Sequence, residues 1–278
     1  HPETALVLAM VVGDQGLISA EDRDLFNNTG IAHLVAISGL HITLFAMLAG
    51  KGMGLLWRRS QRLCLAAPAP LAGSAFGLLF AVFYSLIAGW GVPAQRTVFM
   101  LLALFVSQLR GGSQSSWDTF FMALFLTLAF DNWAVLDAGF QLSFGAVAVL
   151  VFVTQGHHDY IKPRLEALTG AIKAQYAVTV GLVLPCAMLF NQQSLISPAS
   201  NALSIPWMSF VSTPLALAGG LLQNHAALHW AAESLRFQRM WLNALANTDW
   251  AVIPLPNQPG WVYAIAGIGT LFLLLPRG

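Results

Sequence analysis

Long uninterrupted apolar runs, separated by short polar stretches, constrain the fold of this chain more than any other feature. A bilayer core is about 30 Å thick, and a helix needs about 20 apolar residues to cross it. The runs cover approximately residues 31–50, 68–89, 94–109, 118–130, 133–155, 175–191, 203–222 and 259–275. We therefore predict an all-α fold, a polytopic transmembrane helical bundle of about seven or eight spans.

Composition excludes the soluble alternative. Of the 278 residues, 57% are hydrophobic and only 9% are charged, whereas a soluble domain carries about 25% charged residues. A soluble fold of this length could not cover so much apolar surface, and the exposed remainder would aggregate. The lipid bilayer is therefore the first partner that the sequence predicts.

Three segments depart from simple spans. The run 118–130 would reach only about 20 Å at 1.5 Å per residue, so we expect a broken or re-entrant helix of unknown depth. Residues 4–12 are too short to cross a bilayer. Residues 224–250 interleave tryptophans and leucines with Glu233, Arg236 and Arg239. Both of these segments are expected to be helices at the membrane interface.

Charged residues between the runs predict an orientation. The segment 51–65 has no acidic residue and four basic ones, Lys51, Arg58, Arg59 and Arg62. Cytoplasmic loops are enriched in Lys and Arg, so this segment is expected inside and the acidic stretch 13–29 outside. If every run spans, the segment with Arg236 and Arg239 falls inside, and both chain termini fall outside.

Polar side chains within apolar runs are costly, so each one is a functional hypothesis. Ser38 and His41 are three residues apart and share a helix face, while Gly39 allows another backbone to approach closely. In the purely structural alternative, the serine bonds to its own helix and the histidine to a neighbouring carbonyl. A serine hydrolase that uses Ser38 and His41 is disfavoured, because adjacent turns of one helix orient the two side chains poorly for attack.

Two charged residues lie near the starts of later runs. Arg96 is about one turn into its run, and snorkelling to the interface is the alternative to a functional role. Asp137 and Gln141 are four apart and share a face, with Ser143 to one side; a solvated carboxylate at a helix end is the alternative. Because an unpaired buried charge is expensive, we predict that Arg96 and Asp137, or Asp137 and another buried donor, lie within salt-bridge or one-water distance.

A further polar segment is bracketed by two prolines, Pro198 and Pro206, and contains Asn201 and two serines, with a third serine, Ser197, directly before Pro198. This composition predicts irregular or unwound backbone, which membranes tolerate only where it is buried in protein or lines a wet cavity. By the predicted topology, Arg96, Asp137 and Asn201 lie at similar depth near the outer surface, and His41 lies deeper. We therefore predict a polar funnel that narrows toward Ser38 and His41.

Four strings of the sequence resemble landmarks of the ComEC competence family, in the same order. They are Thr29 to His41 (TGIAHLVAISGLH), the Arg96 segment, Gly139 to Phe144 (GFQLSF), and Asn201 to Pro206. The resemblance extends over about residues 3–275. It implies a bacterial inner-membrane channel, not an enzyme, that passes single-stranded DNA into the cytoplasm during natural transformation or for nutrition.

The resemblance also assigns expected roles. The DNA path would include Ser38, His41, Arg96, Asp137, Gln141, Ser143 and Asn201. Helix packing would involve Gly39, Gly139 and Pro206, and the strand would leave past the basic cytoplasmic residues Arg58, Arg59 and Arg62. Residues 1–278 would form the transmembrane competence domain, with the outer N-terminal domain and the C-terminal nuclease domain of the family absent.

No cofactor or metal is expected. The His157–Asp159 segment lacks the His-x-His-x-Asp-His spacing of a metallo-β-lactamase-like nuclease, and no phosphate-binding loop occurs. Energy would therefore come from a cytoplasmic ATPase, from the membrane potential, or from strand-binding proteins that trap DNA inside. The sequence does not decide the oligomeric state or whether residues 1–278 conduct alone. An ion-coupled transporter of a small solute, with Asp137 as the titrating group, is the alternative function.

Overall fold

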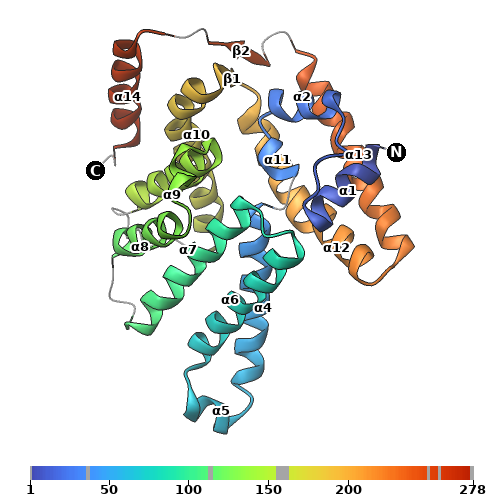
Figure 1. Cartoon of the computed structure of the whole chain (residues 1–278), viewed down its shortest axis with the longest axis vertical. Helices are drawn as coiled ribbons and strands as arrows, with labels where there is room; N and C mark the ends of the chain where they lie inside the picture. Colours follow the sequence, from blue (N-terminus) through green and yellow to red (C-terminus); the bar gives the residue numbers. More distant parts are fainter. Residues whose placement is uncertain are drawn as a thin grey trace.

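The computed structural model is almost entirely helical (Figure 1), and it describes residues 2–35, 38–111, 115–154, 163–248, 251–255 and 258–275. The helices are α1 (Pro2–Val12), α2 (Ala20–Asn28), α3 (Ala32–Val35), α4 (Gly39–Trp57), α5 (Gln61–Ala66), α6 (Ala69–Ile87), α7 (Val92–Leu109), α8 (Ser116–Phe130), the 3-10 helix η1 (Asn132–Leu136), α9 (Ala138–Thr154), α10 (Pro163–Phe190), α11 (Ser197–Trp207), the π-helix η2 (Met208–Ser212), α12 (Thr213–Leu221), α13 (His225–Ala246) and α14 (Gly260–Leu274). Two short strands, β1 (Gln192–Ser194) and β2 (Val252–Pro254), pair in antiparallel fashion.

Helices α4 and α6 form a long antiparallel hairpin with α5 at its tip (Figure 1). Glycines hold the two backbones together. A Cβ atom on Gly50 would lie 2.6 Å from the carbonyl oxygen of Gly73, and one on Gly77 would lie 2.7 Å from that of Ala46. Small residues spaced about one turn apart allow this contact, and they are typical of helix pairs that associate in lipid.

Helices α7, α8, α9, α10 and α14 pack in sequence order on one side of the molecule, where α14 contacts α10 (Figure 1). An aromatic cluster joins α8 to α9. The ring of Phe144 lies 5.8 Å from that of Phe120 and 4.7 Å from that of Phe140, centroid to centroid. These edge-on and tilted ring pairs add specific contacts to apolar burial.

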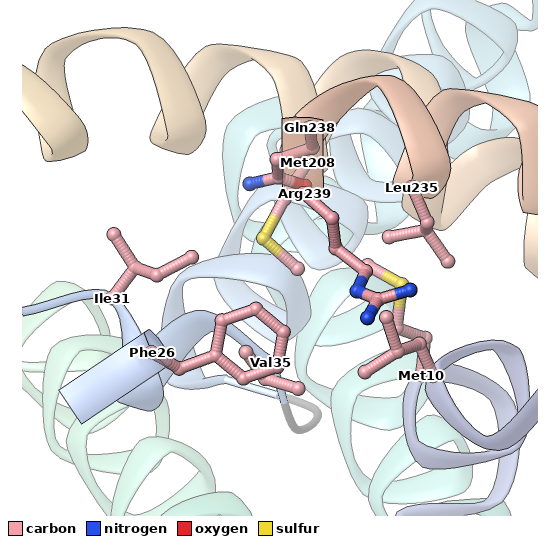
Figure 2. A pocket seen from close by; sticks show the side chains of 9 residues that line it. Met10, Phe26, Ile31, Val35, Met208, Leu235, Gln238 and Arg239 are labelled. Atoms are coloured by element: carbon pink, nitrogen blue, oxygen red, sulfur yellow. The ribbon is translucent and has the colours of Figure 1, made fainter. Parts of the chain in front are cut away.

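Helices α1, α2, α3, α11, η2, α12 and α13 form a second group around an apolar core (Figure 1). Figure 2 shows its centre, where Met10, Phe26, Met208 and Leu235 converge beside the guanidinium of Arg239. The space between them is only about 10 Å³, room for about one water molecule. This core is closed and tightly packed.

Helix α13 runs back along α12, η2 and the end of α11. The sharp turn at Asn224 begins it, the Trp207 indole donates to the carbonyl of Ser234 at 3.1 Å, and the Ser234 hydroxyl donates to that of Ser212 at 2.9 Å. After α13, β2 pairs with β1, which directly precedes α11. The chain therefore returns at the end of α13 to the level at which α11 began.

A predicted transmembrane bundle is confirmed in its general form. Among the described residues, five segments are long and apolar enough to cross a membrane: Gly39–Trp57, Ala69–Ile87, Val92–Leu109, Ile172–Phe190 and Ser197–Leu221. The apolar helices at 116–130, 138–154 and 260–274 are shorter. The chain is a membrane protein, and the expected number of about seven or eight spans stays a prediction.

Several predicted boundaries are wrong, each for a local reason. The first span covers Gly39–Trp57 rather than 31–50, because Ser38 caps a new helix. The run 118–130 lies in one unbroken helix, and 133–155 is instead interrupted at Asp137. Helix α1 packs against α12 and α13, with Leu6 and Met10 buried, and its relation to a membrane surface stays a prediction.

The predicted unwinding between Pro198 and Pro206 is also wrong, since α11 is regular there. Pro198 lies in the first turn, where the missing N–H costs nothing. Pro206 removes a backbone donor near the end of α11, and the helix widens into the π-turn of η2 directly afterwards. The helix absorbs the lost hydrogen bond as a π-turn instead of unwinding.

Candidate functional site

Arg96 and Asp137 form a salt bridge between α7 and α9. The distance from Nη1 of Arg96 to Oδ2 of Asp137 is 2.8 Å, and the same carboxylate oxygen accepts a hydrogen bond of 2.8 Å from the backbone N–H of Phe140. The arginine side chain is 6% exposed and the aspartate 50% exposed. The predicted pair is thus confirmed, and its carboxylate also caps the start of α9.

Gly139 makes room for this pair. A Cβ atom at position 139 would lie 3.1 Å from Nη2 of Arg96 and 3.1 Å from Oδ2 of Asp137. A larger residue would require the guanidinium or the carboxylate to shift. The predicted packing role of Gly139 therefore concerns a charged pair rather than two apolar helices.

An adjacent face of α7 contacts the first turn of α4. A Cβ atom on Gly39 would collide with the hydroxyl of Thr97, so the glycine lets α4 approach α7. Because Thr97 follows Arg96, one turn of α7 contacts α4 on one side and α9 on the other. The starts of α4, α7 and α9 consequently meet at one level.

Ser38 and His41 lie at this meeting point. The Ser38 hydroxyl accepts from the backbone N–H of His41 as the N-cap of α4, and it lies 3.1 Å from Nδ1 of the same residue. Nε2 of His41 lies 3.5 Å from the hydroxyl of Thr213, where α12 begins. His41 and Thr213 are each 1% exposed. We call the set Ser38, His41, Arg96, Thr97, Asp137 and Thr213 the polar junction.

A row of small polar residues leads along α11 and η2 to the polar junction. Its members, all buried, are Ser200, Asn201, Ser204, Ser209, Ser212 and Thr213. Asn201 donates to the hydroxyl of Ser197 at 3.0 Å. Within the described part of the chain, the hydroxyls of Ser200, Ser204 and Ser209 and the amide oxygen of Asn201 have no protein partner. In a bilayer such groups need water or a polar solute.

Comparison with known proteins decides the family. The model of a family described as "Competence protein" matches residues 10–278. The chain belongs to the competence protein family. It is 37% identical to the competence protein ComA of Neisseria gonorrhoeae, over 98% of this chain and 38% of that protein.

Other relatives align with this chain over a similar share of its length. It is 32% identical to the uncharacterized protein YcaI of Escherichia coli, over 94% of this chain and 34% of the relative. It is 25% identical to recombination protein 2 of Haemophilus influenzae, over 96% of this chain and 35% of the relative. The chain thus spans little more than a third of these relatives. No solved structure matches it.

The structure of this competence family chain does not form the predicted funnel. Gly39 and Thr97 place Arg96 and Asp137 level with the first turn of α4, so they do not lie outward of His41. Asn201 lies twelve residues before Thr213, about 18 Å away along the helix at 1.5 Å per residue. The polar groups form one tight junction and a row leading away from it.

Other predicted site residues lie apart from the polar junction. Gln141 is exposed and donates to the carbonyl of Val135, and Ser143 is half-buried farther along α9. Pro206 is exposed on α11, so no helix contact is shown for it. The basic residues lie at the other end of α4, where they are exposed: Arg58, Arg59 and Arg62. Roles for these residues in the DNA path stay predictions.

Two features were missed from sequence. Thr97 and Thr213 carried no signal, because an isolated threonine in an apolar run usually bonds its own helix, as Thr97 also does to Pro93 at 3.0 Å.

Arg239 pairs with Asp22 at 2.8 Å and with Glu3 at 3.4 Å. Asp22 and Arg239 therefore lie on the same side, and the prediction that placed 13–29 outside and the Arg239 segment inside is wrong.

No metal site is evident where the chain is described, since no three His, Cys, Asp or Glu side chains converge. The His157–Asp159 segment lies outside the described residues. The absence of a metal and of a cofactor therefore stays a prediction.

Proposed function

We propose that this chain forms the path by which single-stranded DNA crosses the bacterial inner membrane during natural transformation. Membership of the competence protein family supports DNA as the cargo, and the names of relatives such as the competence protein ComA agree with it. The observation that carries the proposal is the polar junction: a paired but unsaturated arginine where α4, α7 and α9 meet within a membrane bundle.

Arg96 suits a phosphate that moves through. Only Nη1 bonds Asp137, and Nε is buried without a protein partner among the described residues. A guanidinium has five donors in a planar fork that matches phosphate oxygens. Asp137 competes with phosphate for the guanidinium of Arg96. Each phosphate of the strand would therefore bind weakly enough to leave when the next phosphate arrives. Transport through a pore requires such balanced binding.

The polar junction is closed in this structure, because Arg96 is 5% and His41 is 1% exposed. Passage of a strand would require α4, α7 and α12 to separate. Hydroxyls of Ser38 and Thr213 would then exchange their contacts with His41 for contacts with water and sugar-phosphate. Energy and direction would come from a cytoplasmic ATPase, strand-binding proteins or the membrane potential, and the nuclease domain expected in the same polypeptide would supply the single strand.

The closed junction also favours a second candidate, an ion-coupled transporter of a small solute. Asp137 is half-exposed and paired with a buried cation, an arrangement that a coupling site also requires. Such a site needs far less width than a DNA strand.

The test uses the full-length protein in its competent host. Arg96→Gln should lower entry of fluorescent DNA into the cytoplasm by at least about tenfold, the effect of losing one charged hydrogen bond. Arg96→Lys should retain part of the uptake, and Arg110→Gln, at the far end of α7, should retain all of it. Protein levels are measured by immunoblot.

Normal uptake by Arg96→Gln at normal protein level would contradict the DNA path. If Asp137→Asn instead abolished a proton-linked solute flux while DNA entry stayed intact, the transporter would be the correct function.

A further inference from the structure

A lateral groove opens between α4, α6 and the C-terminal half of α7. Figure 1 shows α7 diverging from the α4/α6 hairpin toward the α5 end. The groove has a volume of about 520 Å³. Its floor is the close contact of Gly50 with Gly73, and its walls include Met47 of α4 and Leu104 and Phe105 of α7.

This groove cannot be empty in a bilayer. The three helices that form it are all long and apolar enough to span the membrane. Protein interiors and their lipid boundary are densely packed, so an apolar groove at bilayer depth is filled by a lipid chain or by another apolar helix. Filling the groove with water is unfavourable, because its walls are mostly apolar.

Charge distinguishes between these occupants. Lys51 and Arg58 both line the groove, and no acidic residue does. They are seven residues apart, two turns of α4, and therefore lie on one face. Both are exposed, and neither forms a salt bridge within the described chain. Two unpaired cations beside an apolar channel match a phosphate headgroup above an acyl chain.

We propose that the groove between α4, α6 and α7 binds one anionic phospholipid, with an acyl chain between the helices and its phosphate on Lys51 and Arg58. This site is distinct from the polar junction and does not depend on DNA transport. The lipid would hold the end of α7 against the hairpin at the membrane surface. Arg59 and Arg62 do not line the groove and remain available to other ligands.

The headgroup contact is tested by native mass spectrometry of the full-length protein from nanodiscs with equal phosphatidylglycerol and phosphatidylethanolamine. The wild type should retain phosphatidylglycerol in preference. The double variant Lys51→Gln/Arg58→Gln should lose about tenfold or more of that preference, since each basic residue at the surface attracts anionic lipid. The matched control Arg59→Gln/Arg62→Gln, equal in charge change, should keep it.

The chain-binding part is tested separately by filling the groove. Gly54 lines the groove, and a Cβ there would meet only the carbonyl of Ala69 at an ordinary 3.5 Å. Gly54→Leu should therefore fold and displace the lipid, whereas Gly52→Leu, with nothing within 4 Å of its Cβ and no place in the lining, should not.

Four results would overturn the proposal. These are no preference in the wild type, equal loss in both charge variants, a retained lipid in a folded Gly54→Leu protein, or a dimer mass without lipid. The last would assign the groove to a second copy of the chain.

Discussion

At the scale of single residues, the charged pair and Ser38 could be predicted from sequence, and the threonine hydroxyls could not. Arg96 and Asp137 each stood out because an ionisable group in an apolar run must find a partner. A threonine in an apolar run can be purely structural or functional, and the sequence does not distinguish these roles for Thr97 and Thr213. Only the fold shows that Thr213 meets His41. Burial alone does not make a threonine functional, so substitution is needed to separate the structural from the functional role.

Replacing Thr213 by Val removes the hydroxyl that faces Nε2 of His41 and preserves the side-chain shape. We expect DNA uptake to fall several-fold at normal protein level, as the loss of one buried hydrogen bond implies. The double variant His41→Ala/Thr213→Val should be no worse than His41→Ala, because contacting residues are not additive. Thr127→Val is the control, since Thr127 is equally buried but bonds Ala123 within α8. Additive losses in the double variant would show that the two residues act separately.

At the scale of elements, the α4/α6 hairpin makes the sharpest prediction. Gly77→Leu places a side chain 2.7 Å from a backbone oxygen of α4, which cannot move aside without separating the helices. We expect a loss of about 3 kcal/mol or more in unfolding free energy, measured by denaturation in detergent. Gly52→Leu, on an open face of α4, should cost almost nothing. Equal stability of the two variants would refute the glycine contact.

Helix existence was predictable and helix ends were less so. The apolar runs placed α6, α7, α8 and α14 within a few residues, because the bilayer demands continuous apolar helices. The break before Gly39 was missed, since Ser38 reads as an interior residue of a run until its capping contact is seen. Pro206 predicted an irregularity, but its form, a π-turn directly after α11, is seen only in the structure.

At the scale of the whole molecule, α13 changes the topology. Because α13 returns along α11 and α12, α14 begins on the same side of the molecule as α2. If α14 crosses the membrane, its C-terminal end lies on the side of Arg58. The expected arrangement with both termini outside then becomes one with the C-terminal end of α14 inside.

Labelling of intact cells with a membrane-impermeant maleimide checks this arrangement. Native Cys64, exposed in α5, should be protected in a Cys186→Ser background, and a cysteine replacing exposed Asp24 should react. Position 22 is unsuitable, because Asp22 is buried against Arg239. A cysteine placed after residue 275 should be protected. Reaction at Cys64 and not at position 24 would show that the protein has the opposite orientation in the membrane.

The central claim, that DNA passes through the polar junction, is tested most directly by cross-linking to a strand in transit. Small photoreactive residues at positions 38 and 97 of the full-length protein face the meeting point of α4, α7 and α12, whereas one at exposed Leu48 faces away. During arrested uptake of labelled DNA, we expect adducts at positions 38 and 97 and none at 48. Adducts at 48 alone, or none at any position while DNA still enters the cytoplasm, would contradict the account.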